Sequence, residues 1–337
     1  MNKMKRLILI DGNSLLSSSF FGSMDSAAWY KGDKDKVREK LMKTSAGQYT
    51  NAVLGMTKIL LKIFKEQNPE YMAVAWDVNR DTFRRKIFPE YKSHRGDTAD
   101  ELRSQFPVMR DVLDAMGIAQ FRYEGFEADD VIGSLSKKFE TEVPVFIMTK
   151  DQDALQLVTE NTRVWLNTST AKDKISEFFG DLPKGAYNVP SNYFEFTPET
   201  FPFYYKGLSP IQIIDLKAVE GDKSDFIPGV SGVGEKAIYP LLNEFKTVEN
   251  IYEYIENNDE KTAKEFFKEL GIKRSPLKNL KEGKDMAFMS KKLATIKCDM
   301  EQLQEVTLDS LEVNIDQEKM NEKFKELEFN SLIKDKK

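Results

Sequence analysis

Nine acidic side chains stand where short apolar runs end or where helical patterns begin, and they are the residues of this 337-residue chain best placed to do chemistry together. Two spacings are informative. Glu127 and Asp130, three residues apart, would share a helix face, and Asp151 and Asp153, two apart, would share one side of an extended backbone. The candidates for one cleft are Asp11, Asp77, Glu127, Asp129, Asp130, Asp151, Asp153, Asp222 and Asp225.

A carboxylate cluster of this size favours a metal site, although a single aspartate at such a position is commonly a helix cap or a turn residue. Two like charges about 4 Å apart repel by ~4 kcal/mol at an effective dielectric constant near 20, so a cluster needs cations. The single histidine, His94, and the single cysteine, Cys298, exclude histidine-cluster and cysteine-rich metal sites. Oxygen ligands favour Mg²⁺ or Mn²⁺, and paired ions of this kind typically serve phosphoryl transfer. The predicted substrate is a phosphodiester.

Residues 80–95 form a basic segment in a chain whose net charge is −5. Its position directly after Asp77 would place cations beside the predicted metals, where they could contact phosphates, and Phe83, Phe88 and Tyr91 could stack on bases. A solvated charged helix is the alternative interpretation. The basic side chains are Arg80, Arg84, Arg85, Lys86, Lys92 and Arg95.

A glycine-rich segment at 229–237, GVSGVGEKA, places Gly232 and Gly234 shortly before Lys236. A Walker A loop would need the lysine directly after its closing glycine, and a dinucleotide fingerprint would need a preceding strand, whereas IIDLKAVEGD is typical of a helix. A helix-hairpin-helix that holds DNA phosphates fits better, and an ordinary turn remains open.

The elements that must position these residues alternate between strands and helices. Apolar runs predict strands at RLILI ending at Asp11, YMAVAW ending at Asp77, VPVFIM before Asp151, and TRVWL from Thr162. Helical patterns begin near Thr50, Leu102 and Glu127. This order predicts a doubly wound, mainly parallel α/β sheet, in which ligands bind at the carboxyl ends of the strands.

The length indicates about two domains. The character becomes helical from about Ile211, and segments 23–46 and 168–207 have the composition of surface insertions. The longest apolar run, YMAVAW, is far shorter than the roughly 20 residues that cross a bilayer, and the N-terminus lacks a signal-peptide core. We therefore expect a cytoplasmic protein.

Ordered motifs over most of the chain resemble the 5′-nuclease or flap-endonuclease family, which includes the N-terminal domain of bacterial DNA polymerase I, stand-alone phage 5′-exonucleases and RNase H-type enzymes. The motifs are LILIDGNS at 7–14, TNAVLG at 50–55, TFRRKIFPEYKSHR at 82–95, GFEADDVIGSL at 125–135, KDQDALQLV at 150–158, GDKSDFIPGVSGVGEKA at 221–237 and SKKLATIKCD at 290–299. No polymerase domain follows, so we expect closer similarity to the separate phage enzymes. If a phage encodes this chain, the expected location is the host cytoplasm.

The resemblance implies a PIN-like nuclease domain at 1–210, with a helical arch at 80–110, and a helical DNA-binding domain at 211–337. A helix-three-turn-helix at 213–245 would grip duplex DNA, with Gly229, Gly232, Gly234 and Lys236 at the backbone and a possible K⁺ on main-chain carbonyls. Arg80 and Arg85 would also contact DNA.

The resemblance also implies two metal groups, one holding Asp11, Asp77, Glu127, Asp129 and Asp130 and the other holding Asp151, Asp153, Asp222 and Asp225. It assigns Tyr91, Lys92 and Arg95 to the arch segment, where the lysine and arginine approach the scissile phosphate, and Arg84 to another basic position there. Two positions depart from the pattern: Phe226 replaces a usual Asn, and Lys150 replaces a frequent Gly.

These features predict a metal-dependent 5′ to 3′ exonuclease and 5′-flap endonuclease that acts in replication and removes RNA primers. The expected partners are DNA with flaps, nicks or free 5′ ends and RNA–DNA hybrid, with a clamp or single-strand-binding protein as further candidates, and the expected state is a monomer. A non-catalytic junction-binding protein on the same scaffold and a PIN-like ribonuclease are the alternatives. The nine retained carboxylates disfavour the first, and the glycine hairpin disfavours the second.

Overall fold

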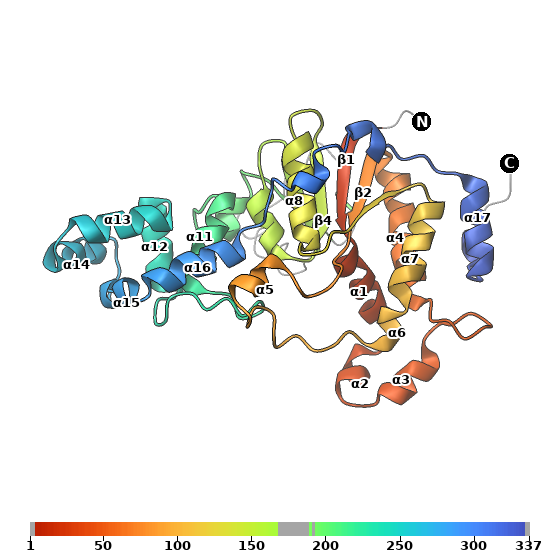
Figure 1. The fold of residues 1–337 in the computed structure, drawn as a ribbon, viewed down its shortest axis with the longest axis horizontal. Coiled ribbons are helices and arrows are strands. Elements are labelled where there is room, and N and C mark those ends of the chain that lie inside the picture. Colours follow the sequence, from red (N-terminus) through yellow and green to blue (C-terminus); the bar gives the residue numbers. More distant parts are fainter. Residues whose placement is uncertain (1–3, 168–188, 191–192, 334–337) are drawn as a thin grey trace.

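A six-stranded sheet forms the centre of the protein in a computed structural model that describes residues 4–167, 189–190 and 193–333 (Figure 1). The strand order is β3-β2-β1-β4-β5-β6. All neighbouring strands are parallel except β6, which runs antiparallel to β5. The bounds are β1 Met4–Asp11, β2 Pro69–Ala75, β3 Ala119–Phe121, β4 Val145–Thr149, β5 Thr162–Leu166 and β6 Phe194–Phe196.

The central strands are apolar on both faces because helices cover the sheet from both sides. In β1, Leu7 and Leu9 point into one hydrophobic core, whereas Ile8 and Ile10 point into the other. This alternation explains why the predicted strands read as continuous apolar runs, and it confirms the doubly wound α/β fold. The sequence did not indicate β3 and β6, which have only three residues each.

Among the described residues, helices that follow or precede the central strands cover both faces of the sheet. On the first face lie α1 Gly12–Gly22, α4 Asn51–Gln67 and α7 Gln105–Ala115, and on the second lies α8 Ala128–Phe139. The helices predicted near Thr50, Leu102 and Glu127 correspond to α4, to α6 Asp100–Arg103 with α7, and to α8. Because β1 pairs parallel with both β2 and β4, the carboxyl ends of these three strands meet at one edge of the sheet.

The expected arch segment, residues 80–110, is less helical than predicted. It contains α5 Phe83–Ile87, α6 and the start of α7, and between α5 and α6 the chain forms a turn at 89–94 and an irregular connection at 95–99 (Figure 1). Pro89 accounts for the end of α5, because the residue before a proline avoids helical geometry, and Phe88 is extended with φ −141° and ψ 100°.

The segment 23–46 folds into two short helices, α2 Ser26–Tyr30 and α3 Lys34–Lys40. The segment packs against α4 and α7, because it contributes Trp29, Val37 and Leu41 to their hydrophobic core. Most of the other expected insertion, 168–207, lies outside the described residues, although β6, α10 Phe201–Tyr204 and the tight turns beside them are described.

The helical region extends away from the sheet on the side of α8 (Figure 1). Its helices are α11 Ile213–Glu220, α12 Glu235–Phe245, α13 Val248–Asn257, α14 Glu260–Glu269, α15 Leu277–Glu282 and α16 Lys284–Ala294. The glycine-rich segment connects α11 to α12, as predicted. Buried side chains of α8, α11 and α12 belong to one hydrophobic core, so no solvent layer separates this region from the sheet.

The last part of the chain returns to the sheet, which differs from the expectation that 211–337 forms one helical domain. After α16, the backbone N–H of Val313 donates to the carbonyl of Glu70 at 2.9 Å, and α17 Gln317–Glu326 buries Met320 and Phe324 in the core beside α7. The hydrophobic periodicity of α17 could not predict this packing, because an amphipathic pattern shows that one helix face is buried but not which surface covers it. The boundary near residue 210 stays a prediction.

Within the described ranges, no helix has the length and apolar character needed to cross a membrane.

Candidate active site

A cavity of about 1350 Å³ opens at the edge where β1, β2 and β4 end. Seven of the nine predicted metal-binding carboxylates line it: Asp11, Asp77, Glu127, Asp129, Asp151, Asp153 and Asp222. Asp130 and Asp225 are not among its lining residues. The convergence at strand ends is the arrangement that the sequence predicts.

The backbone fixes Asp11 and Asp77 through helix ends as well as strand ends. Asp11 closes β1 and caps α1, where its Oδ1 accepts from the backbone N–H of Ser14 at 2.9 Å. Asp77 follows β2, and its Oδ1 accepts from the N–H of Ala128 at the start of α8, at 2.7 Å. Asp11 Oδ2 also accepts from the Thr149 hydroxyl at 3.0 Å. Both oxygens of Asp11 and one of Asp77 are thus held, and the two strands are joined to the helices on both faces.

The first turn of α8 presents Glu127 and Asp129 to the cavity. Asp129 carries a buried oxygen, Oδ1, that has no hydrogen-bond partner. An unpaired buried carboxylate oxygen is costly, and it is uncommon in a folded protein without a bound ion or water. This orphaned acceptor is a specific sign that the cavity takes a cation.

On the other side of the cavity, Lys217 bridges two carboxylates. Its ammonium pairs with Asp153 and with Oδ2 of Asp222, the latter at 2.5 Å. Asp151 stands next to them and accepts from the N–H of Asp153 at 2.9 Å. Sequence reasoning missed Lys217, because it lies on α11 and reaches Asp153 only through tertiary packing.

Burial and mutual repulsion raise the proton affinity of several of these carboxylates. The pKa of Asp11 is raised to about 7, first by burial and then by the charges of Asp77 and Asp151. Burial and Asp151 likewise raise the pKa of Asp153 to about 7, although Lys217 opposes the shift. The pKa of Asp129 is raised well above its usual value by burial, Asp151 and Asp11. A positive ion would relieve this repulsion.

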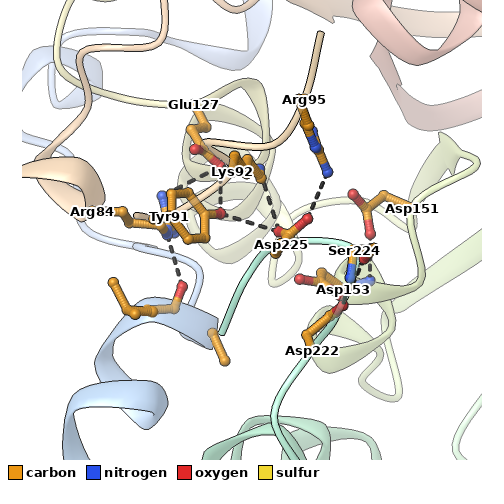
Figure 2. Close-up of polar contacts among 12 residues, drawn as sticks. Arg84, Tyr91, Lys92, Arg95, Glu127, Asp151, Asp153, Asp222, Ser224 and Asp225 are labelled. Carbon is orange, nitrogen blue, oxygen red and sulfur yellow. Dashed lines mark hydrogen bonds and ion pairs between the residues drawn. The ribbon is translucent and has the colours of Figure 1, made fainter. Parts of the chain in front are cut away.

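A second group, called here the cavity cluster, consists of Tyr91, Lys92, Arg95, Glu127 and Asp225 (Figure 2). Lys92 Nζ lies 2.8 Å from Glu127 Oε2 and 3.4 Å from Asp225 Oδ2, and Arg95 Nη2 donates to Asp225 Oδ1 at 2.5 Å. The Tyr91 hydroxyl lies 3.2 Å from both acids. Burial alone would lower the pKa of Lys92, but the carboxylates outweigh it and raise that pKa well above its usual value.

Arg84 and Asp130 form a separate buried pair. The Arg84 guanidinium donates to both oxygens of Asp130, at 2.8 and 2.7 Å, and to the carbonyls of Leu293 and Thr295. Asp130 also accepts from the backbone N–H of Lys297 at 2.9 Å. This differs from the expectation that Arg84 is a catalytic basic residue of the arch segment and that Asp130 binds a metal, because both side chains are fully occupied and buried.

The cavity wall is more basic than the sequence motif indicated. Arg80 and Arg85 line it as predicted, and Arg80 donates to the carbonyl of Arg95 at 2.8 Å. Arg103, Arg110 and Arg122 also line it, from α6, from α7 and from the end of β3. Burial and the like charge of Arg122 lower the pKa of Arg110. Spacing gave no signal for these three residues, because they come together only in the fold.

The glycine hairpin lies apart from the cavity lining. Gly229 has φ +62°, and a Cβ there would lie 2.4 Å from the backbone nitrogen of Gly221, so the tight loop requires glycine. Gly232 has φ +77°, and Gly234 precedes α12 with open space around it. Lys236 is exposed in the first turn of α12. Gly232, Gly234 and Lys236 are exposed, but Gly229 is buried and its N–H donates to Ser290 Oγ at 3.0 Å, which differs from the expectation that Gly229 contacts the DNA backbone.

Across residues 4–167, 189–190 and 193–333, no three His, Cys, Asp or Glu side chains form a ready-made metal-binding group. Lysine and arginine side chains occupy several of the carboxylates instead. The donor set nevertheless fits hard divalent ions, because its oxygens converge without nitrogen or sulfur ligands and one of them is buried and unpartnered.

Comparison with known families accounts for most of the chain. The profile of the 5′-3′ exonuclease N-terminal resolvase-like domain matches residues 6–180, and that of the 5′-3′ exonuclease C-terminal SAM fold matches residues 208–326. A 5′-3′ exonuclease of Halalkalibacterium halodurans is 35% identical over 308 residues, which cover 90% of this chain and 88% of that protein.

DNA polymerase I of Bacillus subtilis is 37% identical over 335 residues, covering 99% of this chain and 32% of the polymerase. The chain therefore spans about a third of the length of such polymerase relatives.

Among solved structures, T5 5′-exonuclease with bound zinc superposes with a TM-score of 0.58 at 18% identity, covering 96% of this chain and 99% of the other. The catalytic core of Rad2 in complex with DNA substrate gives 0.51 at 14%, covering 96% and 87%. At such identities the likeness shows the fold. It agrees with the mainly parallel sheet and the helical region described above.

Proposed function

The chain belongs to the 5′-3′ exonuclease family, and from that premise we propose that it is a divalent-metal-dependent 5′ to 3′ exonuclease and a structure-specific 5′-flap endonuclease. One observation carries the proposal: seven acidic side chains converge on a single cavity whose wall also holds Lys92, Arg95 and further arginines. A site of this composition suits a phosphodiester, because it offers oxygen ligands for cations beside donors for phosphate oxygens.

The proposed metal ligands are the seven carboxylates that line the cavity. Bound Mg²⁺ or Mn²⁺ would neutralise these acids and stabilise the charge on the attacking and leaving oxygens of the phosphodiester. Asp129 Oδ1, buried and without a hydrogen-bond partner, would gain a partner in such an ion. Asp225 stays a candidate only if its cationic partners leave it, because Lys92, Arg95 and Tyr91 surround its carboxylate.

Lys92 and Arg95 are the proposed phosphate-binding side chains. Each now pairs with a carboxylate, but the Arg95 side chain is 45% exposed and Lys92 lines the cavity. A scissile phosphate would replace Asp225 and Glu127 as their partner, and the two cations would then stabilise the negative charge that develops on the phosphorus-bound oxygens. Tyr91, almost fully buried, holds Glu127 and Asp225 in place and does not reach out toward solvent.

The proposed substrate is duplex DNA with a 5′ flap, a nick or a free 5′ end, including RNA-primed ends met in replication. Two of the solved relatives described above support this, since one carries a divalent metal and the other a DNA substrate. The hairpin between α11 and α12 would bind the duplex backbone without reading its sequence. Its main-chain carbonyls are also candidate ligands for K⁺. Action as a monomer in the cytoplasm, and recruitment by a clamp or single-strand-binding protein, belong to the same proposal.

The deciding experiment is cleavage of labelled 5′-flap, nicked and RNA-primed duplexes by the whole chain with Mg²⁺, Mn²⁺ or chelator. We expect cleavage near the junction with either ion and none with chelator. Binding without cleavage in every condition would favour the non-catalytic junction protein. Cleavage of structured RNA alone, with duplex DNA untouched, would favour the PIN-like ribonuclease.

A further inference from the structure

Two short segments more than a hundred residues apart meet beside the cavity. The backbone N–H of Lys92 donates to the carbonyl of Asp225 at 2.9 Å, and the side chains of Tyr91 and Arg95 both reach the Asp225 carboxylate. The loop around Asp225 is itself closed, because Asp222 and Ile227 exchange two backbone hydrogen bonds of 2.8 Å. A turn at 91–95 therefore rests on the tip of a tight hairpin.

An aromatic pair lies at the outer end of this contact. The rings of His94 and Phe226 stack with centroids 4.5 Å apart and an interplanar angle of 22°. Each residue is the sequence neighbour of a partner in the Arg95–Asp225 ion pair. The stack is exposed, with Phe226 at 46%, so its contribution is to the relative placement of two segments rather than to a buried core.

The backbone at this junction is strained on both sides. Lys92 has φ +52° and Phe226 has φ +60°, a region that few residues with a Cβ adopt. Asparagine tolerates that conformation better than phenylalanine does. Strained residues that persist are typical of functional sites, where the surrounding contacts hold them. At position 226 the phenylalanine ring stacks on His94, which an asparagine side chain could not do in the same way.

We propose that His94 and Phe226 are positioning residues: their stack clasps the 91–95 turn to the 222–227 hairpin and thereby aims Lys92 and Arg95 at the cavity. The proposal rests on the proposed nuclease function for its kinetic consequences, but the clasp itself is a property of the protein alone. It also gives a role to Phe226, which departs from the family pattern at this position.

The sharpest variant is Phe226→Asn, because it removes the ring and suits the left-handed backbone. We expect kcat on a 5′-flap substrate to fall about threefold to tenfold, as the loss of an aromatic contact predicts, while KM changes less than about twofold. The midpoint of thermal unfolding should stay equal or rise. Phe226→Tyr keeps the ring and should restore the wild-type rate. Phe203→Asn, at an equally exposed phenylalanine on α10, is the matched control and should leave kcat unchanged.

A measurement without metal or substrate tests the clasp directly. Trypsin cleavage after Lys92 or Arg95 requires the turn to open, so Phe226→Asn and His94→Ala should both accelerate it in the metal-free protein. In a double-mutant cycle the two effects should be less than additive, since either change breaks the same contact.

Several results would overturn the inference. Additive effects, or unchanged trypsin rates and kcat in both variants, would show that the stack holds nothing in place. A rise in KM alone would mean that the rings contact substrate instead. If the wild-type protein cleaves no substrate, the proposed function fails, and the trypsin cycle still decides whether the clasp exists.

Discussion

Two ion-paired groups at the base of the arch segment use the same residue types but differ in their surroundings. In the buried pair, Arg84 and Asp130 are about 3% and 0% exposed, and backbone carbonyls and N–H groups take up their remaining capacity. In the cavity cluster, Arg95 is 45% exposed, and Lys92 shares its charge between two acids. The hydrogen-bonding capacity of the buried pair is fully used, whereas Arg95 in the cavity cluster is accessible to another partner.

We infer that the buried pair contributes to stability, whereas the cavity cluster takes part in the chemistry. A buried and fully bonded pair is expensive to break, because removing one partner leaves a charge without compensation. In the cavity cluster only Arg95 is well exposed, so its ion pair costs less to exchange. Asp225 is 5% exposed and needs another counter-charge when its cations turn to a phosphate. Motif spacing cannot make this distinction, since the basic and acidic residues of both groups look alike in the sequence.

The largest effect should come from the cavity side, at Asp77. We expect Asp77→Asn to reduce turnover by orders of magnitude while affinity for flap DNA stays nearly intact, because a metal ligand is lost but the phosphate-binding cations remain. The Asn oxygen can still accept from the N–H of Ala128, so folding should survive. Rates are to be measured under single-turnover conditions. An unaltered rate would refute the metal assignment.

Breaking the buried pair of Arg84 and Asp130 should lower the stability of the fold. We expect Arg84→Met to lower the free energy of unfolding by about 3–5 kcal/mol, because Asp130 would be left charged and buried. Urea denaturation measures this. The double variant Arg84→Met/Asp130→Asn keeps an acceptor for the N–H of Lys297 and should recover part of the loss. Wild-type stability in the single variant would contradict the distinction between the two groups.

Lys92→Ala should show the opposite pattern. We expect kcat to fall about 10²–10³-fold, as for the loss of a donor to a developing negative charge, with duplex binding and thermal stability changed much less. Lys86→Ala, an exposed lysine on the neighbouring α5, serves as the control. A large loss of stability with normal turnover would place Lys92 with the buried pair.

The smallest effect should appear at the arginine wall. If Arg110 contacts one phosphate, Arg110→Ala should reduce the slope of log affinity against log salt by about 1 and weaken binding at low salt, with kcat unchanged. Lys58→Ala, on the far helix α4, should leave the slope as it is. An equal slope in both variants would remove Arg110 from the substrate path.

Much of the fold followed from the sequence because buried parallel strands leave continuous apolar runs and because Asp11, Asp77 and Asp151 directly follow them. The meeting of their carboxylates at one edge is a consequence of parallel topology. The resemblance to a nuclease family added the roles of individual residues, and the matching profiles confirm the family.

The parts that could not be predicted depend on distant contacts. The burial of Arg84 is decided by the carbonyls of Leu293 and Thr295, which follow it by some two hundred residues. Lys217 joins the site because α11 packs beside the turn that holds Asp153. The short strands β3 and β6 give no periodic signal, since three residues cannot show an alternation.

The hydrophobic core that runs without a break from α8 into α11 and α12 has a thermodynamic consequence. The two regions that sequence profiles distinguish should melt as one cooperative unit, giving a single calorimetric peak. Removing residues from 211 onward would uncover the apolar face of α8, so the nuclease half is not a detachable module. Recombination between relatives should therefore succeed only when both halves are exchanged together.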